Sequence, residues 1–186
     1  MATVLAQQQY TPDDLLTMPD GKRFELVDGN LVECEMSLQA GIVAGNLTTA
    51  LNAISKPQNL GAVAVETTYR CFPDDPDMVR RPDVSFIVTA RLSPEIMTGH
   101  VPIPPDLAVE ILSPNDLAYD IDRKVGEYLR AGVRLVWVVN PVERTISISR
   151  GDGTVGKVAA DGTLDGEDIV PGFRCPAAEI FRPAGT

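Results

Sequence analysis

Two acidic residues stand in segments that otherwise favour a buried strand. Glu110 lies inside the run LAVEIL at 107–112, and its neighbours in that run are apolar. Asp83 follows Pro82 and opens the apolar segment VSFIV. A carboxylate in such surroundings costs several kcal/mol unless a cation pairs with it or it binds a ligand. Both residues are therefore candidates for a site.

A basic residue of the following helical segment is aimed at the same place. At about 100° per residue, the apolar side chains of segment 113–132 fall in one arc of roughly 120°, which Lys124 borders. The arc contains Leu117, Ile121, Val125, Tyr128 and Leu129. Arg123, Glu127 and Arg130 lie on the other side and are predicted to face solvent. The long stem of Lys124 can cross an apolar layer and bring its ammonium to the carboxylates.

Two carboxylates and a lysine have a chemical use together. Oxygen-rich sites with one or two carboxylates and several waters suit Mg²⁺ or Mn²⁺, and the backbone carbonyl of Ile111 is a further candidate ligand. Such a metal acidifies a bound water, and a lysine orients that water or offsets charge. The alternative is a buried structural ion pair between Glu110 and Lys124, with Asp83 ending a turn. Periodicity alone supports the two interpretations about equally.

The elements that must position these residues alternate between strands and helices. The sequence predicts a single α/β domain with one sheet. Helices are predicted from Pro12 to about Met18, over 39–54, from Ser113 or Asn115 to Gly132, and over 175–181. Strands are predicted on both sides of Asp28-Gly29 and over 62–72, 83–88, 107–112, 133–141 and 144–150. Residues 151–168 are predicted to form a loop or a weak edge hairpin.

Composition excludes several classes of protein. The 186 residues carry a formal net charge of −10 and show no basic stripe, so strong non-specific DNA binding is not expected. No run of about 18 apolar residues predicts a membrane span, and the start lacks the pattern of a signal peptide. We therefore expect a cytoplasmic protein. The three isolated cysteines argue against a disulfide framework or a structural zinc site.

Several segments in order resemble one known family. They are KRFELVDGNLVE, RRPDVSFI, PPDLAVEILSP, AYDIDRKVGEYLRAGV and VWVVNP. Together they resemble the Uma-two family of the PD-(D/E)XK nuclease superfamily, over about residues 10 to 182 of a single domain spanning 1–186. The resemblance implies a restriction-endonuclease-like fold, in which helices flank a mixed β-sheet and an N-terminal β-hairpin is an extension. It also implies a divalent metal and phosphodiester hydrolysis.

The resemblance assigns roles to the same three residues. Asp83 matches the acid of the Pro-Asp motif, and Glu110 matches the acid of the (D/E)XK element. The superfamily lysine should stand two residues after that acid, where this sequence has Leu112. Relatives in this family commonly supply a lysine from the following helix, and Lys124 matches that position.

Three further residues match less specific positions. Glu25 matches an acidic position and is a candidate metal ligand, although a solvent-facing hairpin residue is the alternative. Gln39 stands near where many relatives carry a histidine; it can position a water or phosphate but cannot titrate. Asp120 precedes Lys124 by four residues and is expected to orient it through a helix-surface pair. The only histidine, His100, is expected at the surface.

The sequence thus predicts an Mg²⁺- or Mn²⁺-dependent endonuclease that hydrolyses DNA phosphodiester bonds. A homodimer is expected by analogy with nucleases that cut two strands. Two alternatives stay open. The acidic charge favours a catalytically silent nuclease-fold module that associates with DNA or protein. A hydrolase of small phosphate esters, which needs no basic face, is the other.

Overall fold

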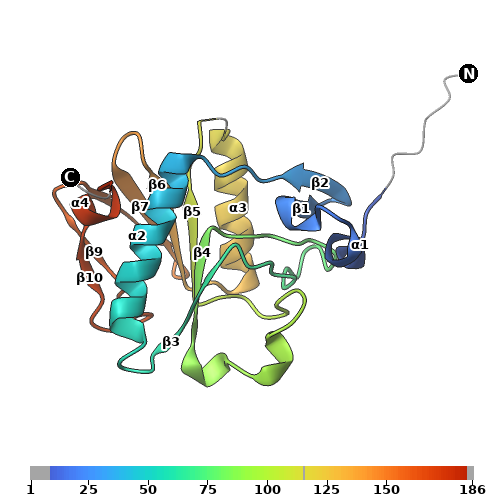
Figure 1. Ribbon diagram of the computed structural model, residues 1–186, viewed down its shortest axis with the longest axis horizontal. Coiled ribbons are helices and arrows are strands. Elements are labelled where there is room, and N and C mark those ends of the chain that lie inside the picture. Colours follow the sequence, from blue (N-terminus) through green and yellow to red (C-terminus); the bar gives the residue numbers. More distant parts are fainter. Residues whose placement is uncertain (1–8, 115, 184–186) are drawn as a thin grey trace, which may run out of the picture.

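A six-stranded mixed sheet forms the centre of the computed structural model, which describes residues 9–114 and 116–183 (Figure 1). The strand order is β3-β4-β5-β6-β7-β8, and only β5 and β6 are parallel neighbours. The strands are β3 Gly61–Val65, β4 Val84–Val88, β5 Leu107–Ile111, β6 Leu135–Asn140, β7 Thr145–Arg150 and β8 Val155–Ala159. This architecture confirms the predicted fold class, a single α/β domain with a mixed sheet flanked by helices.

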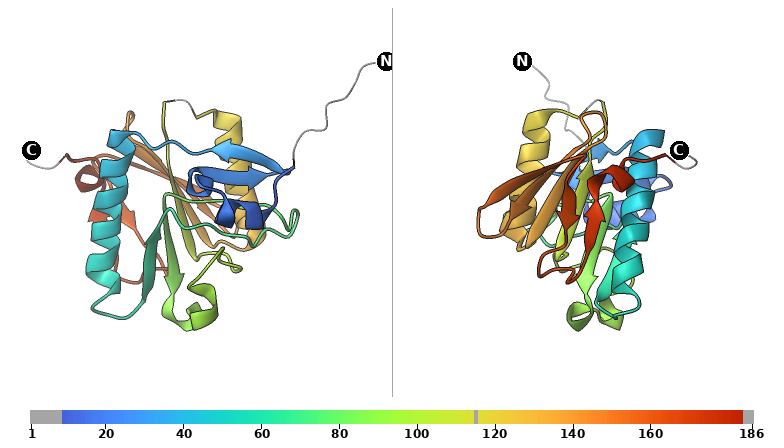
Figure 2. Two further views of the ribbon diagram at one scale, coloured as in Figure 1. Left: turned by 45° about the vertical axis from the view of Figure 1, so that its right-hand side comes forward. Right: turned by 90° about the vertical axis from the view of Figure 1, so that its left-hand side faces the viewer.

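Two helices cover opposite faces of this sheet, as the right-hand view of Figure 2 shows. They are α2 (Leu38–Ser55) and α3 (Ala118–Ala131). The alternation of side chains along β5 determines which of them point toward α2 and which toward α3. Val109 packs into the cluster that contains the apolar side chains of α2, whereas Ala108 packs with Tyr128 of α3. Because successive strand residues point to opposite faces, Glu110 points toward α3.

The predicted N-terminal hairpin is present and is tied to the rest of the domain. It consists of β1 (Phe24–Val27) and β2 (Asn30–Glu33), and the helix α1 (Pro12–Thr17) precedes it. Leu26 and Val79 exchange two backbone hydrogen bonds of 2.9 and 2.8 Å. The segment that leads into Asp83 is thereby joined to the hairpin.

The C-terminal elements extend the core on the α2 side. They are β9 (Thr163–Asp165), β10 (Arg174–Pro176) and α4 (Ala177–Ile180), and the two strands form a small antiparallel sheet. Leu164 and Ile180 are buried in the same cluster as the α2 side chains. Part of the predicted loop or edge hairpin at 151–168 is the regular edge strand β8.

Two predicted boundaries are wrong for local reasons. The strand predicted over 62–72 ends at Val65, because Glu66 has a left-handed backbone with φ of 48°. The helix predicted from Ser113 begins only at Ala118, since Asp116 accepts a hydrogen bond from the Ser113 N–H and holds a turn. Asn115, the other predicted start, lies outside the described residues. The predicted end at Gly132 is confirmed, with φ of 99°.

The three cysteines are free thiols, as their spacing predicts. Over residues 9–114 and 116–183, no helix is long and apolar enough to cross a membrane.

Candidate functional site

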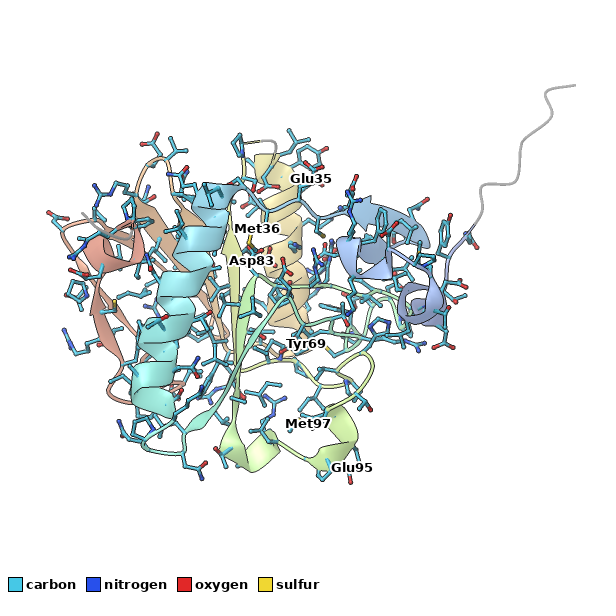
Figure 3. The ribbon with its side chains drawn as sticks, viewed as in Figure 1. Glu35, Met36, Tyr69, Asp83, Glu95 and Met97 are labelled. Carbon is cyan, nitrogen blue, oxygen red and sulfur yellow. The ribbon has the colours of Figure 1, made fainter. Side chains whose placement is uncertain are left out.

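Asp83 and Glu110 come from neighbouring strands at one level of the sheet. Val84 of β4 is paired with Val109 of β5, so continuing this register by one residue places Asp83 opposite Glu110. The Ile111 N–H donates a 2.6 Å hydrogen bond to Asp83 Oδ2, which fixes that carboxylate at the end of β5. Both carboxylates line a cavity of about 340 Å³. Figure 3 shows Asp83 between α2 and α3 in that view.

Lys124 reaches this pair from the middle of α3. Its Nζ lies 2.8 Å from Glu110 Oε2 and 3.0 Å from Glu25 Oε1. One turn later, the hydroxyl of Tyr128 donates a 2.6 Å hydrogen bond to Glu110 Oε1. The contact between Lys124 and Glu110 that the helical arc predicts is therefore present. Tyr128 is fully buried, as expected, and its hydroxyl adds a contact to Glu110 that the sequence did not predict.

A buried arginine links this group to the N-terminal hairpin. Arg80 is 3% exposed, and its Nη1 lies 2.9 Å from Glu25 Oε2. Its Nε and Nη2 donate to Glu127 Oε2 at 2.8 and 2.5 Å. The prediction that Glu127 faces solvent is wrong, because the segment carrying Arg80 covers that side of α3. The solvent-facing alternative for Glu25 is wrong for the same reason, since Glu25 is 2% exposed.

Arg80 and Glu127 are the residues of this network that the sequence reasoning missed. The helical period predicts that Glu127 faces solvent, and Arg80 is not among the candidate residues of the sequence analysis. A signal was available in the sequence, because the segment FELV carries an acid that also needs a buried cation. The doublet of Arg80 and Arg81 is the nearest basic pair to the Pro-Asp motif, but nothing local says which acid it meets.

The pKa values of the site follow from burial and from charge crowding. Burial and the charge of Glu110 raise the pKa of Asp83 to about 7. Burial also raises the pKa of Glu110, and the charge of Glu25 adds to this rise while Lys124 opposes it. For Lys124, burial alone would lower the pKa, but the carboxylates of Glu110 and Glu25 raise it above its usual value. Lys124 is therefore an ammonium ion at neutral pH.

The donor set at Asp83 and Glu110 fits a divalent cation. Asp83 Oδ2 accepts the Ile111 N–H, whereas Asp83 Oδ1 accepts no hydrogen bond from the described residues. Two crowded carboxylates at a solvent-reachable cavity match the sites that bind Mg²⁺ through one or two carboxylates and waters. In the described part of the chain, no three His, Cys, Asp or Glu side chains gather as a metal site. A divalent cation bound at Asp83 and Glu110 would thus have few ligands from the protein.

Glu25 has less capacity for a metal than its motif position implies. Its Oε1 accepts the Arg81 N–H at 2.7 Å as well as Lys124, and its Oε2 is held by Arg80. Burial raises the pKa of Glu25, but Lys124 and Arg80 more than offset this and lower it. Glu25 is thus placed as an anion that fixes Lys124. Ile111, whose carbonyl is a candidate ligand, lines the cavity.

Gln39 and Asp120 lie differently from what their proposed orienting roles require. Gln39 is on α2, across the sheet from α3, where its Nε2 lies 3.4 Å from the Pro141 carbonyl. It does not line the cavity. Asp120 does line the cavity, but it pairs with Arg123 at 3.3 Å and not with Lys124. The predicted pair between Asp120 and Lys124 is therefore absent.

His100 lies outside the cavity lining and is half-buried, not on the open surface. Its two ring nitrogens lie 2.8 Å from the Thr68 hydroxyl and 2.8 Å from the Pro12 carbonyl. These contacts join α1 to the loop before β4 and indicate a structural role.

Comparisons with known proteins bear on the fold and the family of this chain. No curated protein matches the chain. A solved structure described as a putative nuclease belonging to DUF820, from Anabaena variabilis, is 21% identical, with a TM-score of 0.77. The match covers 92% of this chain and 97% of that one, and at this identity it establishes the fold alone. The family model Uma2, described as "Putative restriction endonuclease", matches residues 12–178. The chain therefore belongs to the Uma2 family.

Proposed function

We propose that the protein is a divalent-metal-dependent nuclease that hydrolyses DNA phosphodiester bonds at the Asp83–Glu110 pair. One observation carries the proposal: two crowded carboxylates and a buried lysine, 2.8 Å from Glu110, meet at one cavity. Asp83 and Glu110 would hold Mg²⁺ or Mn²⁺, and the Ile111 carbonyl is a further candidate ligand. Such an ion supplies a Lewis acid that acidifies a bound water and offsets phosphoryl charge.

Lys124 acts in this proposal as a cation and not as a base. Because Glu110 and Glu25 raise its pKa, it keeps its proton at neutral pH and can only donate hydrogen bonds. Its ammonium would orient the attacking water and stabilise negative charge on the phosphate. Glu25 also holds this ammonium, at 3.0 Å from its Oε1, and is a positioning residue.

Cleavage assays on three substrates test the proposal. Plasmid, single-stranded DNA and RNA are incubated with Mg²⁺ or Mn²⁺ and with wild type, Glu110→Gln or Glu95→Gln. Glu95 is an exposed glutamate that Figure 3 shows far below Asp83 in that view, so Glu95→Gln is the matched control. We expect metal-dependent cleavage by wild type and by the control, and a loss of about 100-fold or more in Glu110→Gln. Equal cleavage by all three proteins would refute the catalytic assignment.

A second candidate, a hydrolase of small phosphate esters, is favoured by the charge of the cavity. Seven acidic and four basic residues line it, which disfavours a long polyanion more than a small ester. Bis(p-nitrophenyl) phosphate and p-nitrophenyl phosphate are the discriminating substrates. Turnover of these esters without cleavage of any nucleic acid would select this candidate.

The homodimer stays a prediction. Cutting both strands of a duplex requires two active sites or two binding events. Light scattering coupled to size exclusion measures the mass directly, and a 20.0 kDa species at all concentrations would contradict the dimer.

A further inference from the structure

The cavity offers an incoming anion very little free positive charge. Of its four basic lining residues, three are already committed to carboxylates. Arg80 is held by Glu25 and Glu127, and Lys124 by Glu110 and Glu25. Arg123 lies 3.3 Å from Asp120. The fourth is Arg81.

Arg81 differs from its neighbour in how its side chain is used. Its backbone N–H donates a 2.7 Å hydrogen bond to Glu25 Oε1, which fixes the main chain beside the site. Its guanidinium, unlike that of Arg80, makes no hydrogen bond or ion pair with any residue in 9–114 or 116–183. Arg81 is half-buried, lines the cavity and stands two residues before Asp83. The N–H donors of its guanidinium are therefore available to a ligand in the cavity.

The charge of Arg81 acts on Cys34, another residue of the cavity lining. Burial raises the pKa of the Cys34 thiol to about 12, and the positive charges of Lys124 and Arg81 act against that rise. Cys34 follows β2 directly and lines the same cavity. Arg81, Cys34 and the Asp83–Glu110 pair thus line one and the same cavity.

We propose that the Arg81 guanidinium binds a phosphate oxygen of a phosphodiester substrate next to the Asp83–Glu110 pair. The proposal rests on the proposed function, because it names how that site holds its substrate. A guanidinium presents five donors in a planar fork that suits phosphate oxygens, and such charge-assisted bonds are the strong ones. In a cavity lined mostly by acids, this one contact is expected to decide whether a phosphate enters.

Equilibrium binding of a labelled single-stranded oligonucleotide tests Arg81 separately from catalysis. It is measured by fluorescence anisotropy, with Mg²⁺ and with a chelator, over a range of salt concentrations. The proteins are wild type, Arg81→Gln, Arg81→Lys and Arg174→Gln. Arg174 is a matched control, since it is 70% exposed on β10 and lines neither the cavity nor the hairpin. Cleavage and the Mn²⁺-induced rise in Tm are recorded for the same four proteins.

We expect Arg81→Gln to weaken binding by about 10-fold or more. The slope of log K against log salt concentration should fall by about 0.7, the value for one phosphate contact on a single strand. Arg81→Lys should keep most of the slope, and Arg174→Gln should match wild type. The Mn²⁺-induced rise in Tm should be the same in all four proteins, because Arg81 is not assigned to the metal.

Each other result has a definite meaning. If Arg81→Gln binds like Arg174→Gln while wild type cleaves, the Arg81 proposal is overturned and the nuclease proposal stands. Arg81-dependent binding without cleavage by wild type supports the phosphate contact and overturns the nuclease activity. Absence of binding by wild type overturns the Arg81 proposal, and absence of cleavage as well overturns both proposals. If both Arg81 variants lose binding together with the Mn²⁺ effect, Arg81 maintains the fold and the proposal fails.

Discussion

Asp83→Asn should stabilise the metal-free protein while removing its metal site. The wild-type carboxylate has a pKa of about 7, against an ordinary value of 3.8, because it is buried beside Glu110. Ionising it in the folded state at pH 8 therefore costs up to about 4 kcal/mol of folding stability. Asn is isosteric and uncharged. Its Oδ1 can still accept the Ile111 N–H, and its amide can donate toward Glu110.

The sign of the pH dependence follows from the raised pKa. The stability contribution of Asp83 is fully present below pH 3.8 and is lost as pH rises through about 7. The advantage of Asp83→Asn should therefore be largest at pH 8 and fall to about 2 kcal/mol at most near pH 5. Because Asp83 keeps some contact with solvent, we expect an observed gain of about 1–3 kcal/mol at pH 8.

Urea denaturation in a chelator at pH 8 and pH 5 measures both effects. Asp161→Asn is the control, since Asp161 is exposed in the turn between β8 and β9 and the substitution removes the same charge. Adding Mg²⁺ or Mn²⁺ should then stabilise wild type and Asp161→Asn, but not Asp83→Asn. If Asp83→Asn is less stable than wild type at pH 8 in chelator, the carboxylate is not under electrostatic strain and the reasoning is wrong.

Three further predictions concern the buried charges. Arg80→Gln should lower the free energy of unfolding by about 3–5 kcal/mol, because two buried acids lose their cation. In the same urea titration, substitution of the exposed Arg23 (Arg23→Gln) should cost less than about 1 kcal/mol. Equal losses in the two variants would contradict the buried network. Lys124→Met should reduce turnover by about 100-fold or more and keep the Mn²⁺-induced rise in Tm; losing that rise would show that Lys124 only maintains the site. Tyr128→Phe should cost about 1.5–3 kcal/mol, the value of a hydrogen bond to a charged acceptor; an unchanged urea midpoint would contradict the contact with Glu110.

Local sequence patterns were enough to predict the fold class and the central contact of the site. The apolar runs around Glu110 and Asp83 identify strands, and the register of β4 and β5 then places the two acids together. The helical period of 113–132 aims Lys124 at the sheet, and its Nζ lies 2.8 Å from Glu110. These predictions succeed because they depend on one strand pair and one helix, whose periodicities are fixed by backbone geometry.

The wrong predictions depend on contacts between distant segments. Glu127 was assigned to solvent from the period of α3 alone, but a helix can be covered on a second side. The pairing of Leu26 with Val79, 53 residues apart, brings Arg80 over that side. The location of Gln39 away from the cavity lining could not be predicted for a similar reason, because nothing local reveals that α2 packs on the face away from α3. A helical wheel gives the direction of a side chain but not what lies there.

The network of Glu25, Arg80 and Lys124 explains why the lysine can come from a helix and not from the strand of Glu110. The position two residues after Glu110 is Leu112, directly after the end of β5, and its N–H donates to the Val139 carbonyl. A lysine delivered from α3 has a long stem and many rotamers, so it loses more conformational entropy when it is fixed. The carboxylates of Glu25 and Glu110 hold its ammonium from two sides, at 3.0 and 2.8 Å. Arg80 in turn fixes Glu25 and ties the hairpin to α3. On this argument the N-terminal hairpin is part of the site, since removing it would release the lysine that the strand lacks.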